Sequence, residues 1–402
     1  MDWSFLIEGK DAICVSTDSR NLPAGCIFVA LKGETFDGNT FAQKALEQGA
    51  SLAIVDDEQV YSAIQAAGEY SALLVENSLI ALQDLARAWR RQWGKQIIGI
   101  TGTNGKTTTK ELLAAVLSTK YRMHYTQGNL NNSIGVPLTL LQLTAEHELA
   151  IVEMGASHPG DIKELVEVAE PNCGLITNVG KAHLQGFGSF EGVMRTKAEL
   201  YDYLRQHDGF CFRNTDNPYL AEMAGDLRSI AYTTGTMPEG THLVGAYNSE
   251  NIQAALCVGE YFGVNRETGL EAIRAYVPSN NRSQRTVTDS NTLIVDAYNA
   301  NPTSMQAAIN AFKGDTYILG AMRELGDYSH TEHQNIVNML LERKADTVLL
   351  VGDEYRDTTA PYPIFANVDE LCEYLQQHPI SGCTILIKGS RSNKLEKVLP
   401  LL

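Results

Sequence analysis

Short runs of apolar and β-branched residues alternate along this chain with longer stretches in which apolar residues recur at every third or fourth position. The first pattern predicts buried β-strands and the second predicts amphipathic α-helices. The predicted strands are CIFVAL (26–31), QIIGI (96–100), LAIVEM (149–154), GLITNV (174–179), TLIVDAY (292–298), TYILGA (316–321), DTVLLVG (346–352) and TILIKG (384–389). The predicted helices span residues 79–93, 110–120, 161–169, 249–262 and 369–377. This alternation predicts an α/β fold with mostly parallel sheets.

The length of 402 residues predicts two or three domains, because a domain commonly has about 150 residues. A Gly-rich stretch follows the strand at 96–100 and is expected to lie near the start of its own domain, which puts one junction near residue 94. The polar segment PSNNRSQ (278–284) precedes a fresh strand and puts a second junction near residue 284. We therefore expect a small α/β domain at 1–94, a central domain at 95–283 and a C-terminal domain at 284–402.

The formal net charge is −16, which bears on the partners that the protein can have. A protein that binds duplex nucleic acid usually presents a basic face, so nucleic acid is not an expected partner. An acidic surface is compatible with an anionic substrate, because a few Lys, Arg and backbone N–H groups can hold phosphate inside a cleft.

The cysteines and the N-terminal stretch both bear on the cellular compartment. The stretch MDWSFLIEGKDAICVS lacks a basic segment followed by an apolar core, so we expect no signal peptide. No apolar run approaches the roughly 18 residues that cross a bilayer. The seven cysteines (14, 26, 173, 211, 257, 372 and 383) are scattered and form no CxxC motif. We expect free thiols, a cytoplasmic protein and no zinc site.

The stretch GITGTNGKTTT (99–109) lies between a predicted buried strand and a predicted helix. Glycines let the backbone curl so that N–H groups converge on an anion, and the helix N-terminus adds its positive dipole end. Lys106 can reach terminal phosphates, and the hydroxyl of Thr107 can ligate Mg²⁺. The spacing departs from the common phosphate loop, since Ile100 stands where its first glycine belongs. We predict a nucleotide triphosphate site here rather than a plain strand-to-helix turn, and the loop alone leaves the reaction open.

Three further side chains are candidates for chemistry, and the residues alone leave each one ambiguous. Glu153 ends a predicted strand, so it can face the loop and hold Mg²⁺, or it can be an exposed acid. His183 follows the next strand in a turn, where a lone histidine is more often structural than a ligand. Lys197 begins a predicted helix, and its ordinary interpretation is a solvated lysine.

Seven segments together resemble the Mur ligase family. They are GTNGKTTTKELL (102–113), GNLNNSIGVPLTLL (128–141), EMGASHPGDI (153–162), NVGKAHLQGFGS (178–189), YNANPTSM (298–305), MRELG (322–326) and KGSRS (388–392). The segments STDSR (16–20) and ALKGETFDGNTF (30–41) are similar to the family's UDP-sugar-binding domain. The match runs in the expected order from about residue 16 to 397. Tyr247, Val295 and Ala321 depart from it, standing where many members have His, Asp and Asp.

The resemblance implies a P-loop NTPase-like central domain, a Rossmann-like C-terminal domain, and the following site residues. It assigns contacts with ATP to Gly102, Thr103, Asn104, Gly105, Lys106, Thr107, Thr108, Asn251, Arg282 and Asp296. It assigns one Mg²⁺ to Thr107 and Glu153, and a second metal site to Glu153, His183 and a carbamylated Lys197. It assigns the uridine nucleotide to Asp18, Ser19 and Arg20, and a substrate-facing loop to Asn131 and Asn132. It assigns the incoming dipeptide, or closure over it, to Tyr298, Asn299, Asn301, Ser390 and Arg391.

The activity that the resemblance implies is ATP-dependent amide ligation, with Lys106, Glu153, His183 and Lys197 as the catalytic set. The substrates would be D-alanyl-D-alanine and a UDP-N-acetylmuramoyl-tripeptide, joined through an acyl phosphate during peptidoglycan precursor synthesis. The first domain would bind the sugar nucleotide, the second ATP, and the third would close over the site about a hinge near 280–286. The family also suggests a monomer.

Three other functions are compatible with parts of the sequence. Another Mur-type or folylpolyglutamate-type amino acid ligase would share the phosphate loop and the metal residues. A P-loop switch or motor would explain GTNGKT but would leave the Lys197 segment and the sugar-nucleotide domain unused. A noncatalytic scaffold is disfavoured by the intact Lys106.

Overall fold

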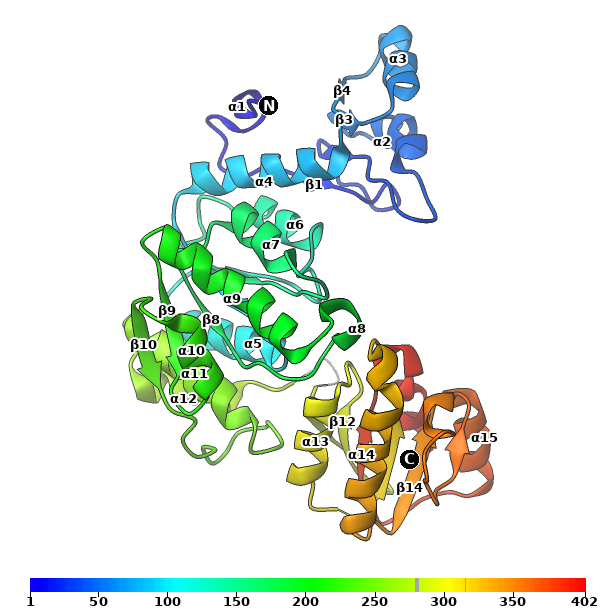
Figure 1. The fold of residues 1–402 in the computed structure, drawn as a ribbon. Helices are drawn as coiled ribbons and strands as arrows, with labels where there is room; N and C mark the ends of the chain where they lie inside the picture. The colour runs from blue at the N-terminus through cyan, green and yellow to red at the C-terminus, as the bar shows by residue number, and fades with distance from the viewer. Residues whose placement is uncertain (279–281, 315) are drawn as a thin grey trace.

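The computed structural model describes residues 1–278, 282–314 and 316–402, and its three sheets follow one another along the chain (Figure 1). The α/β prediction with three domains and mostly parallel sheets is confirmed, because the described strands pair in parallel apart from β11 with β12. Within these ranges, no helix combines the length and the apolar composition that a membrane span requires.

The N-terminal sheet has four parallel strands in the order β1-β2-β3-β4. The strands are β1 (Val15–Ser16), β2 (Ile27–Val29), β3 (Leu52–Val55) and β4 (Ala72–Leu74). The helices of this part are α1 (Ser4–Ile7), η1 (Gly38–Phe41), α2 (Ala42–Glu47), α3 (Glu58–Ala67) and α4 (Ser78–Trp93). Alternate residues of β2 and β3 enter different apolar clusters, so both faces of this small sheet are covered.

Two cysteines of this sheet correct the expectation that all seven are free thiols. Cys14 and Cys26 form a disulfide, with their Cα atoms 4.5 Å apart. The residues come together because β1 and β2 pair in parallel directly after them, which the spacing of 12 residues could not reveal. The other five cysteines are free, as expected. The cysteines therefore give weaker support for a reducing compartment than the sequence suggested.

Helix α4 joins the N-terminal sheet to the middle of the molecule and lies along the helices beneath it (Figure 1). It begins at the N-cap Asn77, whose side chain accepts a hydrogen bond from the N–H of Ile80, and it ends at Gly94 in a left-handed conformation. The indole of Trp89 donates to the carbonyl of Leu143, and Arg90 donates to the carbonyl of Ala169. The apolar face of α4 is thus buried against the central domain.

The central sheet has six parallel strands in the order β10-β9-β8-β5-β7-β6. The strands are β5 (Gln96–Thr101), β6 (Met123–Tyr125), β7 (Leu149–Glu153), β8 (Cys173–Ile176), β9 (Phe210–Asn214) and β10 (Ser229–Tyr232). The helices are α5 (Lys106–Leu117), α6 (Gly135–Leu141), α7 (Asp161–Ala169), α8 (Leu184–Phe187), α9 (Phe190–Gln206), α10 (Pro218–Ala224), α11 (Asn248–Tyr261) and α12 (Arg266–Ala275). Ile97 packs with α6, α7 and α9, whereas Ile98 packs with α5, α11 and α12, so helices cover both faces.

The C-terminal sheet has the order β11-β12-β16-β13-β14-β15. Its strands are β11 (Gln284–Val287), β12 (Thr292–Asp296), β13 (Thr316–Gly320), β14 (Thr347–Val351), β15 (Ile364–Phe365) and β16 (Thr384–Lys388). Its helices are α13 (Pro302–Ala311), η2 (Gly326–Tyr328), α14 (Ser329–Glu342), η3 (Asp353–Tyr355), α15 (Val368–Gln377), η4 (Arg391–Asn393) and η5 (Leu395–Leu401). Helices α13 and α14 cover one face, and α15 with η5 covers the other.

Each of the eight predicted strands and five predicted helices corresponds to an element of the structure, with shifts at the ends. The largest shift is in α5, which begins at Lys106 rather than at residue 110. The helix starts earlier because Gly105 adopts a left-handed conformation that turns the chain directly into its first turn. Lys106 and Thr107 therefore lie on the helix N-terminus rather than on a loop before it. The short edge strands β1, β4, β6 and β15 have two or three residues each and gave no recognisable pattern.

Candidate functional site

A cleft of about 730 Å³ lies between the central and C-terminal domains. The phosphate loop after β5, the end of β7 and the loop after β8 line one side. Residues that follow β12, β13 and β16 line the other side. In parallel α/β sheets ligands bind beyond the carboxyl ends of the strands. Here two such edges face one another, so molecules held by both domains would meet in this cleft.

Two glycines of the phosphate loop have no room for a side chain. Gly102 has φ +142°, and a Cβ there would lie 2.1 Å from Oγ1 of Thr177. Gly105 has φ +79°, and a Cβ there would lie 2.4 Å from Oδ1 of Asn251. Both the backbone conformation and the close packing therefore require glycine, and they bring the loop N–H groups to the start of α5.

The phosphate loop is fastened to the end of the neighbouring strand β8. The N–H of Thr103 donates to the carbonyl of Asn178 over 2.9 Å, and the N–H of Asn104 donates to Oδ1 of the same residue over 3.0 Å. The hydroxyl of Thr177 donates in return to the carbonyl of Asn104 over 2.6 Å. These hydrogen bonds within the protein fix the conformation of the loop, which lowers the ordering cost of binding an anion.

Lys106 lies over the phosphate loop itself. Its Nζ donates to the carbonyl oxygens of Gly102 (2.7 Å) and Thr103 (3.1 Å). Burial lowers the pKa of Lys106 to about 8, and the positive charge of Arg282 acts in the same direction, whereas Glu153 opposes it. A phosphate in the loop would replace weak carbonyl partners with a full negative charge. The arrangement suits Lys106 for neutralising transferred phosphate.

Glu153 ends β7 and is almost fully buried at the edge of the cleft. Its Oε1 accepts hydrogen bonds from the hydroxyl of Thr107 (3.0 Å) and from Nδ2 of Asn131 (2.8 Å). Its Oε2 has no hydrogen-bond partner among the described residues. A buried carboxylate beside a threonine hydroxyl at a helix N-terminus is an oxygen donor set that fits Mg²⁺. The ambiguity between an exposed acid and a cleft acid is thus resolved in favour of the cleft.

His183 lies in the cleft and reaches across to the C-terminal domain. It has a left-handed backbone conformation, φ +49°, which turns the loop after β8 into α8. Its Nδ1 is hydrogen-bonded to Oε2 of Glu324, and the N–H of Gln185 donates to the carbonyl of Glu324 over 3.2 Å. Burial lowers the pKa of His183, and the charge of Glu324 opposes this. His183 is therefore positioned by a carboxylate from another domain.

Lys197 is not the solvated helix lysine that its sequence context suggested. It lies on α9 with 2% of its surface exposed, outside the lining of the cleft. Its Nζ lies 5.4 Å from the ring centre of Phe187. Burial lowers the pKa of Lys197 well below its usual value, and the nearby charge of Lys106 adds to the effect. A buried amine that is easily neutral can react with CO₂ to form a carbamate, which an ammonium cannot do.

The chain does not present a ready-made metal cluster. Among residues 1–278, 282–314 and 316–402, no three His, Cys, Asp or Glu side chains are grouped as metal ligands. Glu153 with Thr107 can hold one ion together with nucleotide oxygens. A second ion near His183 would need the carboxylate that carbamylation of Lys197 creates, since an unmodified cation does not fit there.

The C-terminal side of the cleft carries both positive and negative side chains, and three of its contacts are well defined. Nζ of the buried Lys388 lies 2.6 Å from Oδ2 of Asp296, because β12 and β16 place these residues opposite one another in register. The guanidinium of Arg282 lies 4.0 Å from the ring centre of Tyr298, and that of Arg391 lies 5.3 Å from it. Tyr298 thus brings together two cations that are distant in sequence.

The remaining predicted site residues are divided between the cleft and other places. Asn132, Asn251 and Asn299 line the cleft, whereas Asn301 and Ser390 are buried beside it. Asp18, Ser19 and Arg20 lie in a separate loop between β1 and β2, where the Asp18 carboxylate pairs with the Arg20 guanidinium. The N-terminal sheet that carries this loop and the C-terminal domain lie at opposite ends of the molecule (Figure 1). A substrate held both by this loop and by the cleft would have to extend from one to the other.

Several residues with contacts at the site were not singled out from the sequence. They are Lys110 behind Glu153, Lys388 beside Asp296, Glu324 beside His183, and the ion pair of Lys181 with Glu332. Spacing could have indicated Lys110, which lies one turn after Lys106 on the same helix. The other contacts join distant segments and left no local signal.

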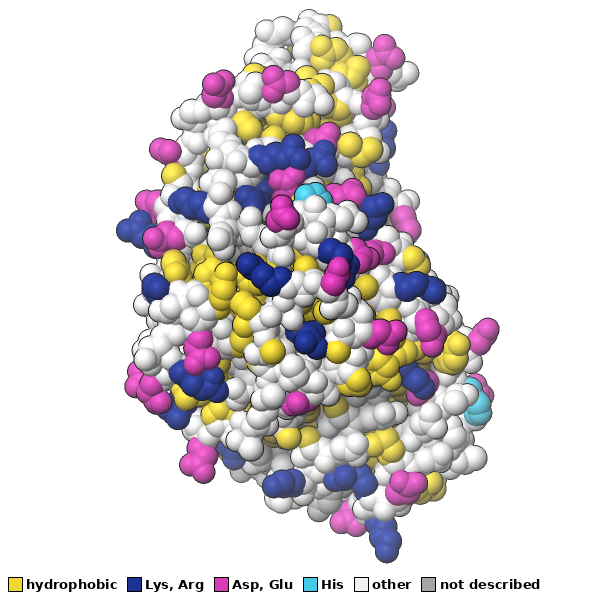
Figure 2. Space-filling view, turned by 60° about the vertical axis from the view of Figure 1, so that its left-hand side comes forward, with side chains coloured by type: hydrophobic (Ala, Val, Ile, Leu, Met, Phe, Trp, Pro, Cys, Tyr) yellow, Lys and Arg dark blue, Asp and Glu magenta, His cyan; other side chains and the backbone are white. Residues whose placement is uncertain are grey.

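One face of the molecule shows how its surface charges are distributed. Figure 2 shows Asp and Glu side chains lying among the Lys and Arg side chains over the face that it presents.

Comparisons with known proteins cover nearly the whole chain. Residues 13–90 match the family described as Mur ligase family, catalytic domain; residues 100–243 match Mur ligase middle domain; and residues 281–391 match Mur ligase, glutamate ligase domain. The UDP-N-acetylmuramoyl-tripeptide--D-alanyl-D-alanine ligase of Bacillus subtilis (strain 168) is 35% identical, over 96% of this chain and 92% of that protein.

Two solved structures share the arrangement of the chain. MurF from Acinetobacter baumannii superposes with a TM-score of 0.84 at 30% identity, covering 96% of this chain and 92% of that one. MurF ligase from Thermotoga maritima, solved in complex with ADP, superposes with a TM-score of 0.85 at 27% identity, covering 98% of both chains.

Proposed function

The chain belongs to the Mur ligase family, and from this membership and the geometry of its cleft we infer that it is an ATP-dependent amide ligase. It joins D-alanyl-D-alanine to UDP-N-acetylmuramoyl-tripeptide in peptidoglycan synthesis, the reaction named for relatives that match it over most of their length. The observation that carries this function is the meeting of two sheet edges in one cleft. A phosphate loop lines one edge, and Arg391 together with the ion pair of Lys388 and Asp296 lines the other.

The reaction requires activation of a carboxylate, because a carboxylate does not react with an amine unaided. A carboxylate oxygen of the tripeptide attacks the γ-phosphorus of ATP, the bond from that phosphorus to the β–γ bridging oxygen breaks, and ADP leaves. The dipeptide amine then attacks the acyl carbon and loses a proton, and the carbon–oxygen bond to phosphate breaks. Two anions must approach one another in the first step. Lys106, at the start of α5, lies against the phosphate loop and reduces that repulsion by neutralising phosphate charge.

We propose that Mg²⁺ is bound by Glu153 and the hydroxyl of Thr107. The ion would supply charge neutralisation and orientation of the phosphates. The support is the buried carboxylate of Glu153, whose Oε1 accepts hydrogen bonds from Thr107 and Asn131, two residues that line the cleft. For the second metal site we propose Glu153, His183 and carbamylated Lys197. Two observations support this second site. Burial lowers the pKa of Lys197, which favours its neutral amine, and a hydrogen bond with Glu324 holds the ring of His183 in place.

We further propose a division of labour among domains at 1–94, 95–283 and 284–402. The first would bind the uridine end through Asp18, Ser19 and Arg20. The second would bind ATP through the loop, Asn251 and Arg282, with Asp296 of the third domain as a further ATP contact. The third would position the dipeptide with Tyr298, Asn299, Asn301, Ser390 and Arg391, with Asn131 and Asn132 facing the tripeptide. Rotation about a hinge near 280–286 would close the cleft and exclude water, which would otherwise hydrolyse the acyl phosphate. Residues 280 and 281 of that hinge lie outside the described part of the chain.

We also propose a cytoplasmic monomer. ATP and a nucleotide-activated sugar are intracellular substrates, and the resemblance to the family implies a monomer.

The deciding experiment is a phosphate-release assay with ATP, Mg²⁺ and UDP-N-acetylmuramoyl-tripeptide. Paired reactions contain D-alanyl-D-alanine or single amino acids, and the tripeptide ends in lysine in one series and in diaminopimelate in the other. We expect phosphate and a lengthened peptide only with the dipeptide, and neither with Lys106→Ala, whose fold should be intact because Nζ contacts only its own loop. Product with a single amino acid would favour another ligase of the superfamily. ATP hydrolysis indifferent to every peptide substrate would favour a switch or motor.

A further inference from the structure

Lys110 is a fully buried lysine one helical turn after Lys106 on α5. Lys106 contacts the carbonyl oxygens of the phosphate loop, whereas Lys110 has a different set of partners and lies outside the cleft lining. An ammonium group out of contact with water is unfavourable unless charges and hydrogen bonds compensate it. The identity of its partners therefore indicates what this lysine does.

Three oxygen atoms surround the ammonium group of Lys110. Nζ donates to the carbonyl of Thr126 over 2.6 Å. It lies 3.1 Å from Oε1 of Glu111 and 3.7 Å from Oε2 of Glu153. Thr126 also contacts Glu153 directly, because its hydroxyl accepts a hydrogen bond from the N–H of Glu153 over 3.0 Å. Lys110, Thr126 and Glu153 thus each contact the other two, and they form a cluster behind the cleft.

The two oxygens of Glu153 are in different surroundings. Oε1 accepts hydrogen bonds from Thr107 and Asn131, two residues that line the cleft. Oε2 is buried and has no hydrogen-bond partner among the described residues, and the positive charge on its side comes from Lys110. The carboxylate is therefore oriented, with Oε1 towards the cleft and Oε2 towards the ammonium group of Lys110.

We propose that Lys110 is a positioning residue for the magnesium–nucleotide site. Its ammonium group balances Oε2 of Glu153 from within the protein, so that Oε1 stays directed at the cleft before the nucleotide arrives. This inference rests on the proposed function, since it takes Glu153 as a ligand of the Mg²⁺ that accompanies ATP. Lys110 contacts neither the reacting atoms nor the phosphate loop, so it acts through Glu153.

A simpler role would be structural. Lys110 could only tie α5 to the end of β6 through the carbonyl of Thr126, or only pair with the half-buried Glu111 on its own helix. Both roles would make Lys110 important for stability, but neither would couple it to Glu153 or to Mg²⁺. The experiment must therefore measure coupling rather than loss alone.

The first measurement is a double-mutant cycle in melting temperature, without nucleotide or Mg²⁺. The test cycle contains Lys110→Met, Glu153→Gln and the double variant that carries both substitutions. The matched control cycle contains Lys110→Met, Glu111→Gln and the double variant of these two. We expect Lys110→Met to lower Tm by about 5 °C or more, because it leaves a buried carboxylate without its cation. In the Glu153→Gln background the drop should be less than half as large, and in the Glu111→Gln background nearly unchanged. Additive shifts in the Glu153 cycle would overturn the proposal.

The second measurement is ADP binding by titration calorimetry with and without Mg²⁺. In the wild type we expect Mg²⁺ to tighten ADP binding, and in Lys110→Met we expect at least a tenfold smaller gain. Binding of ADP without Mg²⁺ should change by less than about twofold. Lys120→Met is the control, since Lys120 also donates to backbone carbonyls, those of Phe262 and Gly263, but lies away from Glu153.

The outcomes separate this inference from the proposed function. A wild type whose ADP binding is indifferent to Mg²⁺ would contradict the magnesium site itself. A wild type that responds to Mg²⁺, together with an equal or larger gain in Lys110→Met, would overturn the role of Lys110 alone.

Discussion

Asn301, the N-cap of α13, exchanges hydrogen bonds with Asn104 of the phosphate loop. Nδ2 of Asn301 donates to Oδ1 of Asn104 over 2.8 Å, and Nδ2 of Asn104 donates back to Oδ1 of Asn301 over 3.4 Å. The same Oδ1 of Asn301 accepts the N–H of Ser304 and completes the helix cap. One side chain therefore fixes the start of a helix in the C-terminal domain and contacts the ATP-binding loop of the central domain.

This pair of residues predicts that docking of the C-terminal domain is coupled to the conformation of the phosphate loop. Asn301→Ala should lower kcat by about tenfold, a barrier increase of about 1.4 kcal/mol, and also destabilise the domain by about 1 kcal/mol through the lost cap. Asn301→Ser keeps a capping hydroxyl, but this side chain is too short to reach Asn104. Its kcat should therefore fall as in Asn301→Ala, while its Tm stays within about 2 °C of the wild type. Steady-state phosphate release and thermal melting check the two effects, and normal kcat in Asn301→Ser would show that the pair is unimportant.

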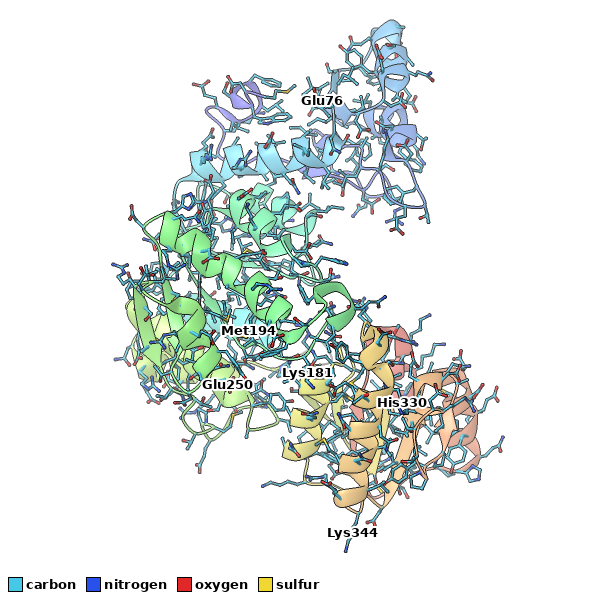
Figure 3. All side chains as sticks on the ribbon, viewed as in Figure 1. Glu76, Lys181, Met194, Glu250, His330 and Lys344 are labelled. Atoms are coloured by element: carbon cyan, nitrogen blue, oxygen red, sulfur yellow. A yellow bond between two sulfur atoms is a disulfide. The ribbon has the colours of Figure 1, made fainter. Side chains whose placement is uncertain are left out.

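The ion pair of Lys181 with Glu332 predicts a second contact that stabilises the docking of the C-terminal domain on the central domain. Nζ of Lys181 lies 2.7 Å from Oε1 of Glu332, whose side chain is 2% exposed, at the junction of the two domains (Figure 3). The N–H of Lys181 also donates to the hydroxyl of Thr303. Because Lys181 is half exposed, the pair should contribute only about 1 kcal/mol. Glu332→Gln should therefore favour a more open arrangement, seen as a larger radius of gyration in solution scattering without ligands.

Lys344→Met is the matched control for that experiment, since it removes a lysine from the far end of the same domain (Figure 3). Scattering profiles of Glu332→Gln that superpose on those of the wild type would show that this ion pair does not stabilise the docked arrangement.

The burial of Lys197 predicts a carbamate that can be replaced chemically. Lys197→Ala should be nearly inactive and should recover part of its activity with added acetate or formate, because a small carboxylate can enter the space of the lost carbamate. The wild type incubated with ¹³C-bicarbonate should show a carbamate carbonyl resonance that is missing in Lys197→Ala. Full activity of the alanine variant in bicarbonate-free buffer would refute the idea.

His124 predicts loss of stability on mild acidification. Its Nε2 is hydrogen-bonded to the carbonyl of Thr139, and its ring centre lies 5.0 Å from that of His147. Burial lowers the pKa of His124 from 6.5 to about 4. The unfolded state therefore takes up a proton first, so stability is complete above about pH 6.5 and falls as the pH drops towards 4. The loss should reach about 2–3 kcal/mol.

Urea melts from pH 7 to pH 4.5 would measure this dependence. His124→Gln should flatten it, whereas the exposed His330 (Figure 3) should be replaceable by Gln with no change in slope. An equal slope in His124→Gln and the wild type would assign the acid sensitivity to other groups.

Local pattern determined much of this protein. The strand QIIGI, the glycine-rich turn after it and the helix that follows depend on residues that are neighbours in the chain, since hydrogen bonding and sterics act there over a few residues. The start of that helix at Lys106 rather than at residue 110 was seen only in the structure. The resemblance to a known family then pointed to Glu153, His183 and Lys197, which the residues alone had left ambiguous.

Only the tertiary structure decided which distant groups meet and which are removed from water. The disulfide of Cys14 with Cys26 follows from strand pairing, and the burial of Lys197 follows from packing of α9. The contacts of Lys110 with Glu153 and of Asn104 with Asn301 join segments that no periodicity links. Charge and hydrogen-bond energies depend on distance and on exclusion of solvent, and the chain acquires both only when its sheets and domains come together.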